Sequence, residues 1–307
     1  KRRREIEAQF NCKIKIVKHE TNVASIAPVM LSGDKLGDLV QFDLADLFQA
    51  IGSGYIRPLD TIKGIDASDE RWIKGYTKLG YYKGSPYGLY FWRPEEVRGL
   101  ILYNKTLLKQ YGINENLPQL VREGKWTFDK FREIAIACTR DTDGDGIPNT
   151  YGVLTSTPEK LGTDFMHANN ASIATIADDG KIVESFQSSQ ALTAMNYLYN
   201  LVNVDKVFYI PAQWTTKKTY YAGGMSSADI YANFTNNKVA FCVAEAWIAN
   251  QIVRPTATSI QYGILPMPKG PDASGYVSSA HYALLFAVTN NNTYVEKVVP
   301  IINALGL

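Results

Sequence analysis

Residues 101–113, ILYNKTLLKQYGI, change from one secondary-structure pattern to another within a short stretch. The apolar run Leu100–Tyr103 is typical of a strand, and Thr106–Tyr111 is typical of a short helix that Gly112 closes. A strand followed at once by a helix is compatible with several fold classes. The elements on either side of this stretch therefore decide the class.

The first sixty residues repeat the alternation. Helical patterns at the start of the chain, at Ser25–Leu31 and at Leu44–Ile51 alternate with strand patterns at Cys12–Val17 and Leu39–Phe42. This rhythm predicts an α/β layer with a parallel sheet. Ligands of such sheets sit beyond the carboxyl ends of the strands, which makes Asp43 a candidate ligand contact. An N-cap of the helix that follows is an equally good interpretation of Asp43.

Two later elements have strong signals. Trp126–Thr139 predicts a helix in which Thr127 is the N-cap and Trp126 packs on Phe131. Val239–Val243 is a continuous apolar run between polar residues, which is typical of a buried strand.

Composition limits the classes of protein that fit. The chain has 307 residues, enough for two domains, and a net charge of +2, which gives no reason to expect a nucleic-acid partner. Aromatic residues make up 12% of the chain, and 19 of them are tyrosines, which suit surfaces for amphipathic ligands. The three cysteines show no metal-binding or disulfide spacing, and no run of 18 apolar residues is present.

Signatures of catalysis are absent from the sequence. It contains no G-x-S-x-G or H-E-x-x-H motif and no glycine-rich phosphate loop. Spacing alone assigns no pair of carboxylates to acid and base roles. Residue spacing therefore assigns no catalytic site.

The most specific chemical pattern is DTDGDGIPNTYG at residues 141–152. Alternating carboxylates followed by a glycine are how a calcium-binding loop begins. The predicted ligands are Asp141, Asp143, Asp145, the carbonyl of Ile147 and Asn149. Gly152 stands where such loops carry a bidentate glutamate, so the stretch is a weaker calcium site completed from elsewhere or an acidic turn. We expect a calcium ion with a structural role.

Residues 101–113 also resemble a known family. ILYNKTLLKQYGI is similar to the segment YYNKDLFEKAGI of the bacterial extracellular solute-binding proteins of family 1, the carbohydrate-binding group of ABC importers. Other stretches resemble this family in the same order: GDKLGDLVQ at 33–41, GSPYGL at 84–89, GKWTFDKFREIAIACT at 124–139, NNKVAFCVAEAW at 236–247 and YGILPMPKGP at 262–271. Each match alone is weak, but together they span nearly the whole chain.

The resemblance implies a fold and a division of the chain. Family members have a periplasmic-binding-protein type II fold, in which two α/β lobes are joined by a hinge and enclose a ligand cleft. The order of the matches implies that residues 1–109 and 261–307 form the first lobe and residues 110–260 the second. Family members begin one strand earlier and continue into further helices of the second lobe, so both termini are expected to be truncated.

Seven residues are expected to contact the ligand. Sugars present apolar C–H faces and hydroxyl groups, which suit aromatic rings and carboxylates. Trp247 stands where the family has a stacking tryptophan, although a core tryptophan would give the same pattern. Glu245 and Ala246 replace the family's Gly-Ser, and Glu245 is expected to bind sugar hydroxyls or to pair with an arginine. The other candidates lie in loops or at strand ends: Asp43, Trp92, Trp214, Tyr221 and Tyr282.

The resemblance implies a protein that is not an enzyme: it would capture a sugar or oligosaccharide reversibly and deliver it to the permease of an ABC importer. The protein is then expected to be a monomer outside the cytoplasm, either periplasmic or lipid-anchored at the outer face of the cell membrane. Two other classes stay open: a sensing or adhesion module, and a secreted glycoside-processing enzyme with Glu245 and Asp43 as paired carboxylates. A peptide, a polyamine or a phosphate ester is an alternative ligand, but aromatic content and near-neutral charge favour a sugar.

Overall fold

The structure is a computed structural model that describes residues 2–91, 99–155, 158–176, 181–210, 227–278 and 284–306. The chain divides into two units, of which the first contains Lys1–Glu95 and Tyr282–Leu307 and the second contains Glu96–His281. The first unit is thus built from two separate stretches of the chain. Among the described residues, no helix is both long and apolar enough to cross a membrane.

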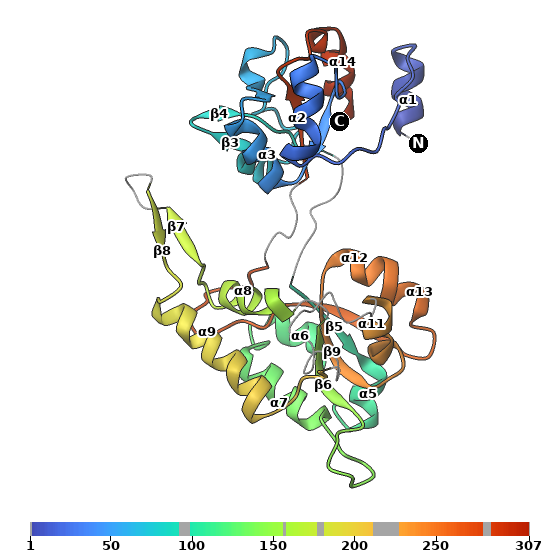
Figure 1. Ribbon diagram of the computed structural model, residues 1–307. Helices are drawn as coiled ribbons and strands as arrows, with labels where there is room; N and C mark the ends of the chain where they lie inside the picture. The colour runs from blue at the N-terminus through green and yellow to red at the C-terminus, as the bar shows by residue number, and fades with distance from the viewer. Residues whose placement is uncertain are drawn as a thin grey trace. The chain divides into compact units, whose positions relative to one another are not determined.

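The first unit is organised around a three-stranded sheet whose central strand comes from the end of the chain (Figure 1). β11 (Leu285–Thr289) lies between β1 (Val40–Phe42) and β2 (Ile56–Arg57) and is antiparallel to both. The predicted parallel sheet is therefore wrong here. β1 and β2 run in the same direction, but β11 separates them.

Helices cover this sheet. α3 (Leu44–Gly52) buries Leu47, Ala50 and Ile51 and shares a core with Ile26 of α2. A second core joins the last helix to Val288 of β11. The helical and short elements of the unit are α1 (Arg2–Gln9), α2 (Val23–Ser32), η1 (Leu59–Thr61), α4 (Lys74–Thr77), η2 (Lys78–Gly80), the hairpin β3 (Tyr81–Tyr82) and β4 (Ser85–Pro86), and α14 (Val295–Leu305).

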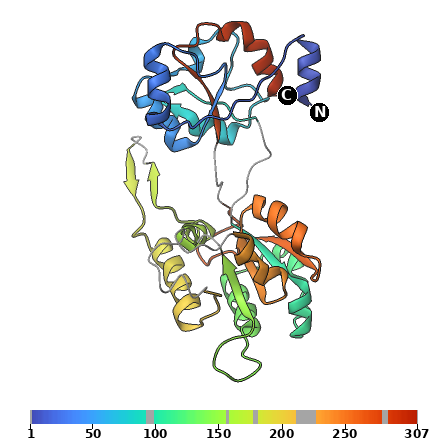
Figure 2. The ribbon, with the colours of Figure 1, turned by 45° about the vertical axis from the view of Figure 1, so that its right-hand side comes forward.

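The second unit contains a four-stranded sheet in the order β10-β5-β9-β6. β6 and β9 are parallel, and the other neighbours are antiparallel. β7 and β8 form a separate hairpin that extends from this unit (Figure 2). The elements are β5 (Leu100–Asn104), α5 (Lys105–Gln110), α6 (Leu117–Arg122), α7 (Phe128–Cys138), β6 (Tyr151–Thr155), α8 (Pro158–Ala168), β7 (Ala174–Ile176), β8 (Ile182–Glu184), α9 (Ser189–Tyr199), η3 (Asn200–Val204), α11 (Ser227–Thr235), β9 (Val239–Ala244), α12 (Ala246–Ile248), η5 (Ala249–Val253), α13 (Arg254–Thr256) and β10 (Tyr262–Pro266).

β9 is the buried strand that the sequence predicts, and all its residues are buried. Phe241 and Val243 join the core formed with α7 and α8, whereas Cys242 and Ala244 join the core on the opposite face with α11. Successive side chains of a strand point to opposite faces, so helices on both sides of the sheet explain the uninterrupted apolar run.

The predicted helix that begins near Trp126 is confirmed as α7. The Thr127 side chain caps the helix by accepting a hydrogen bond from the backbone N–H of Lys130 at 3.4 Å. The Trp126 and Phe131 rings meet edge to face with centroids 5.9 Å apart, as expected for packing across the first turn. Trp126 is fully buried, which agrees with its predicted structural role.

The boundaries between the units differ from the expected ones. β5 and β10, which the resemblance places in the first lobe, belong to the sheet of the second unit. Leu102 pairs with Cys242 on one side and with Ile264 on the other. Among the described residues, 99–109 and 261–278 therefore belong to the second unit, where backbone pairing holds β5 and β10 in its sheet.

The predicted strand Cys12–Val17 is wrong. These residues form neither a strand nor a helix, and Ile16 and Val17 are 65% and 64% exposed. Alternation of apolar and polar residues marks a strand only where a neighbouring strand is available to accept its hydrogen bonds. This stretch has no such neighbour among the described strands.

The three cysteines differ in how deeply they are buried. Burial raises the pKa of the Cys138 thiol to about 12 and also raises the pKa of Cys242, whereas Cys12 is only partly buried. We expect iodoacetamide at pH 8 to alkylate Cys12 alone in the folded protein and all three in urea, since the thiolate is the reactive form. Mass spectrometry measures both outcomes. Alkylation of folded Cys138 as fast as Cys12 would contradict this expectation.

Candidate functional site

Two parallel strands of the second unit end at one edge of its sheet. β6 pairs with β9 so that Thr155 lies opposite Val243, and their carboxyl ends therefore meet. Ligands of open α/β sheets sit beyond the carboxyl ends of the strands. We call this region the site edge and define it by five residues at or just beyond these strand ends: Thr155, Lys160, Asp164, Glu245 and Trp247.

The start of β5 also reaches the site edge. Leu100 lies opposite Ala244, the last residue of β9. Gly99 has a φ of 67°, and a Cβ added there would lie 3.1 Å from Cγ of Met267 and 3.8 Å from the carboxyl carbon of Asp164. Glycine suits both this conformation and the close approach. Asp164, only 4% exposed, is thus packed beside the start of β5.

Glu245 is the first residue after β9 and is 5% exposed. It occupies the N-cap position of α12, but its side chain makes no capping hydrogen bond. Its carboxylate instead accepts a hydrogen bond from the indole N–H of Trp247. Its other oxygen lies 3.6 Å from Nζ of Lys160, in the first turn of α8. Lys160 is therefore a charge partner of Glu245, and the expected pairing with an arginine stays a prediction.

Trp247 is partly buried. It packs against the core that contains Leu102, Tyr231 and Ile248, so the core interpretation holds for part of the ring. The remaining surface stays accessible, as a ligand contact requires. The helix that carries Trp247 passes directly into the π-helical turn Ala249–Val253, and such turns are frequent at functional sites.

The remaining predicted ligand contacts are placed as follows. Asp43 belongs to the first unit and caps α3 by accepting a hydrogen bond from the backbone N–H of Asp46 at 2.8 Å. Its N-cap role is therefore confirmed, and its contact with a ligand stays a prediction. Four other candidates lie outside the described residues: Trp92, Trp214, Tyr221 and Tyr282.

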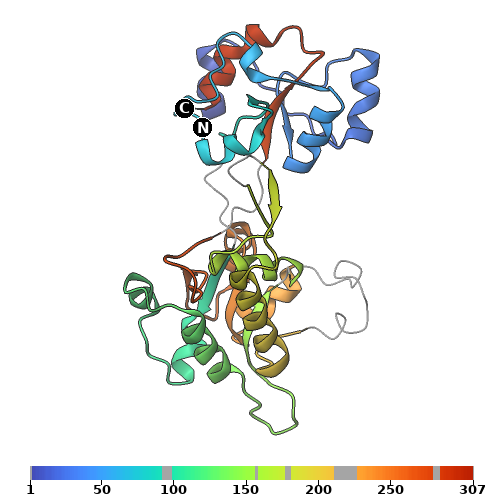
Figure 3. The ribbon, with the colours of Figure 1, turned by 90° about the vertical axis from the view of Figure 1, so that its left-hand side faces the viewer.

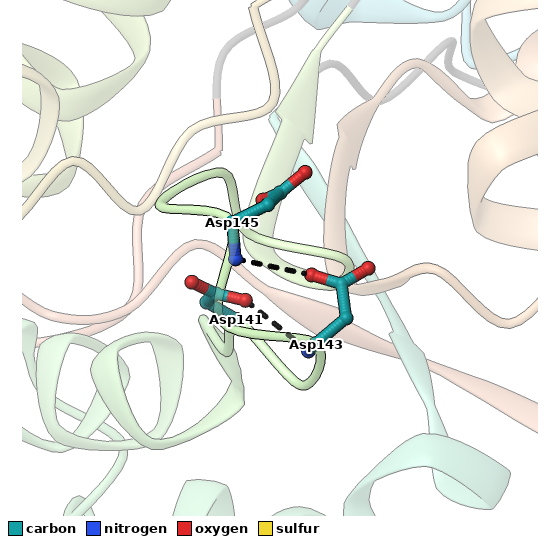
Figure 4. Close-up of side chains that lie close together, drawn as sticks. All are labelled: Asp141, Asp143 and Asp145. Atoms are coloured by element: carbon teal, nitrogen blue, oxygen red, sulfur yellow. Dashed lines mark hydrogen bonds between the residues drawn. The ribbon is translucent and has the colours of Figure 1, made fainter.

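The three aspartates of the acidic loop lie close together between α7 and β6 (Figure 4). One oxygen from each of Asp141, Asp143 and Asp145 lies within 4.8 Å of the others, and all three residues are exposed. Two oxygens that bind one calcium ion at ~2.4 Å are at most ~4.8 Å apart. The three carboxylates are thus close enough to share one cation, and calcium binding stays a prediction.

Hydrogen bonds within the loop hold the carboxylates. Asp141 accepts from the backbone N–H groups of Gly146 and Gly144 at 2.8 and 2.6 Å, and these bonds lower the pKa of its carboxyl group. Asp145 accepts from the N–H of Ile147 at 2.8 Å. Asn149 donates to Asp143 at 2.9 Å. The side chain of Asn149 therefore ties the loop together, and its role as an ion ligand stays a prediction.

The acidic loop and the site edge lie at opposite ends of β6. β6 begins at Tyr151, directly after the loop, and ends at Thr155. A strand rises ~3.3 Å per residue, so these two residues are about 13 Å apart. Figure 3 shows the loop extending from its own end of the sheet. The loop therefore lies at the end of β6 that is away from the site edge.

A model of a known protein family matches most of the chain. The model described as bacterial extracellular solute-binding protein matches residues 6–300. The chain belongs to this family. Its solved relatives share the type II periplasmic-binding-protein fold with mixed α/β content, which confirms the predicted fold class. A search of curated proteins found no match to this solute-binding protein.

Three solved structures illustrate the similarity. UspC of M. tuberculosis has a TM-score of 0.68 and 17% identity, with 100% of this chain and 74% of UspC covered. A Listeria monocytogenes ABC substrate-binding protein in complex with cycloalternan has a TM-score of 0.66 and 16% identity, with 99% and 70% covered. UgpB of M. tuberculosis in complex with glycerophosphocholine has a TM-score of 0.64 and 18% identity, with 99% and 70% covered.

Sequence reasoning missed three residues of the site edge in this solute-binding protein. Thr155 is 2% exposed, and Lys160 and Asp164 follow it on α8. Their position after β6 could have identified them, because β6 runs parallel to β9. The sequence does not reveal that these two strands pair. Glu245 and Trp247 were found because a known pattern covers their stretch.

Proposed function

We propose that this solute-binding protein captures a sugar or oligosaccharide outside the cytoplasm and delivers it to an ABC importer. The observation that carries the proposal is Trp247, which stays partly exposed beside a buried carboxylate at the strand ends of a solute-binding fold. Aromatic faces stack on the C–H faces of sugars, and polar groups beside them bind hydroxyls. Ligand binding would favour closure of the two lobes by its greater affinity for that state.

Charge at the site edge also disfavours an anionic ligand. Lys160 and Glu245 lie within ion-pair distance, so their charges compensate each other. A phosphate ester, such as the ligand of UgpB, would have to compete with Glu245 for Lys160. A neutral sugar does not meet this competition, so we propose carbohydrate over phosphate ester.

A thermal-shift screen tests the ligand class. The purified protein is heated with oligosaccharides, monosaccharides, amino acids, polyamines and glycerophosphodiesters. A ligand at 100 times its Kd stabilises the folded state by about 2.7 kcal/mol, and a domain of 150–250 residues gains ~2–4 °C in Tm per kcal/mol. We expect one or more glycans to raise Tm by about 5–10 °C. A shift with a polyamine or phosphodiester and none with any glycan would overturn the carbohydrate proposal.

Capture without conversion is part of the same proposal. We expect the binding glycan to be recovered intact after long incubation, with no new reducing ends. The importer permease is the proposed partner, the monomer is the proposed state, and the location is periplasmic or lipid-anchored at the outer face of the membrane. The family's extracellular character supports this location. Cross-linking to the permease in membrane vesicles, dependent on the glycan, tests the partnership.

We also propose that the acidic loop binds a structural calcium ion. Asp141, Asp143 and Asp145 supply the carboxylates, and the carbonyl of Ile147 and the side chain of Asn149 are the proposed further ligands. The geometry of the three carboxylates supports this assignment. An ion there would neutralise carboxylates that otherwise repel one another.

Removing the ion should lower stability and leave ligand selectivity intact. We expect EDTA to lower Tm by several degrees and excess calcium to restore it, because an ion bound only by the folded state stabilises it. The double variant D143N/D145N serves as the control, and its Tm should not respond to EDTA. An unchanged Tm in the parent protein contradicts calcium binding, and an altered glycan profile contradicts the purely structural role.

A further inference from the structure

We propose that Glu245 and Lys160 are positioning residues that hold the indole of Trp247 in one orientation for stacking on the ligand. This inference rests on the proposed function and assigns a role to a side chain that the family pattern lacks. Where that pattern has Gly-Ser before the tryptophan, this chain has Glu245 and Ala246. A glycine cannot hold the ring, whereas a carboxylate can.

The carboxylate of Glu245 is directed to the indole and not to the helix. An N-cap side chain normally accepts a hydrogen bond from the backbone of the first turn. Glu245 occupies the N-cap position of α12 without making that bond. It accepts instead from Nε1 of Trp247, two residues further on. The Glu245 carboxylate thus holds the indole of Trp247, and the exposed part of that indole belongs to the proposed ligand-binding surface.

Lys160 connects the Glu245–Trp247 contact to the end of a second strand, β6. The Glu245 side chain is 7% exposed and the Lys160 side chain 30% exposed, so the pair is largely shielded from water. Removing one partner of a shielded pair weakens the compensation of the other charge, which is costly. Lys160 lies in the first turn of α8, which follows β6, and Glu245 directly follows β9. The pair therefore connects Trp247 to the ends of both parallel strands.

Fixing the ring before the ligand arrives should raise affinity. A free tryptophan side chain loses rotational freedom when a ligand holds it, and this cost weakens binding. The hydrogen bond and ion pair make the ring orientation a property of the unliganded protein. This role differs from direct contact of Glu245 with sugar hydroxyls, and the two roles predict different results in the unliganded state.

The test measures the indole without ligand and the affinity with ligand. The full chain is labelled with ¹⁵N at the tryptophan indoles, and the Trp247 Nε1–H resonance is assigned by its loss in Trp247→Phe. We expect Glu245→Ala to broaden this resonance and to speed its exchange with solvent. The same substitution should weaken binding of the glycan found in the screen about tenfold, the effect of losing ~1.4 kcal/mol.

Two further variants support the assignment. Glu245→Gln keeps an oxygen acceptor, so it should recover a narrow resonance and most of the affinity that Glu245→Ala loses. Lys160→Met should give an intermediate exchange rate, because it removes the charge partner and leaves the acceptor. Both keep the approximate size of the side chain, so the test stands even if Glu245→Ala does not fold.

The outcomes separate the positioning role from the proposed function. Unchanged affinity in Trp247→Phe and Trp247→Ala would contradict the ligand contact itself, whatever Glu245 does. Loss of affinity in Trp247→Ala with an unchanged indole resonance in Glu245→Ala and Lys160→Met would overturn the positioning role alone. An affinity loss in Glu245→Ala without any change in the indole resonance would also overturn it, because it would show that Glu245 contacts the sugar directly.

Discussion

Replacing Trp247 with alanine is expected to reduce affinity for the glycan by about thirty-fold or more. Removing a tryptophan at the centre of an interface costs ~2–4 kcal/mol, and 2 kcal/mol corresponds to about thirty-fold in Kd. The stacking surface is lost together with the indole N–H that Glu245 accepts. Isothermal titration calorimetry with the glycan identified by the thermal-shift screen measures the change.

A second exposed aromatic residue provides the matched control. Tyr199 belongs to the same unit, at the end of α9, and is 61% exposed. Because it lies outside the site edge, Tyr199→Ala should leave the Kd unchanged within error. Equal affinities for Trp247→Ala and the parent protein would show that the ligand does not contact this ring.

Replacing Trp126 with alanine is expected to lower the free energy of unfolding by about 3–5 kcal/mol, the usual cost of removing a large buried aromatic side chain. Trp126 is fully buried, and its ring centroid lies 5.7 Å from that of Phe241 on β9. Its indole N–H donates to the carbonyl of Pro266 at 3.0 Å, which links the start of α7 to the end of β10. Urea unfolding followed by circular dichroism measures the loss.

The variant Trp126→Phe separates packing from hydrogen bonding. It retains most of the apolar volume and loses the N–H donor, so its cost should be clearly smaller than that of Trp126→Ala. At temperatures where both variants are folded, the Kd for the glycan should match that of the parent protein. A loss below 1 kcal/mol in Trp126→Ala would mean that the core rearranges to fill the space.

The elements that the sequence predicts best are those specified by local chemistry. α7 has a cap at Thr127 and a buried stripe that consists of Phe128, Phe131, Ile134, Ala135 and Cys138. β9 is apolar throughout because helices cover both faces of its sheet. Both patterns arise from residues that are near one another in sequence, so the sequence alone is enough to predict them.

The elements that the sequence predicts poorly depend on distant partners. Ile14 and Ile16 alternate with lysines as in a strand, but no described strand pairs with them. The expected unit of β5 is wrong because its two neighbours, β9 and β10, both lie more than a hundred residues later in the chain. The Lys160–Glu245 pair was missed for the same reason. The sequence shows the opposite charges of Lys160 and Glu245. It does not show that they lie close together, because their proximity depends on the parallel pairing of β6 and β9.

The position of β11 has a consequence for how the chain folds during synthesis. The second unit is continuous from Glu96 to His281, so its whole sequence leaves the ribosome or the translocation channel before β11 does. The first unit, although synthesised first, lacks its central strand until residues 285–289 emerge. We therefore expect the second unit to complete its folding first. Until then, residues 1–95 remain an incompletely folded intermediate with unpaired strands. Chaperones of the nascent chain would then act mainly on that N-terminal stretch.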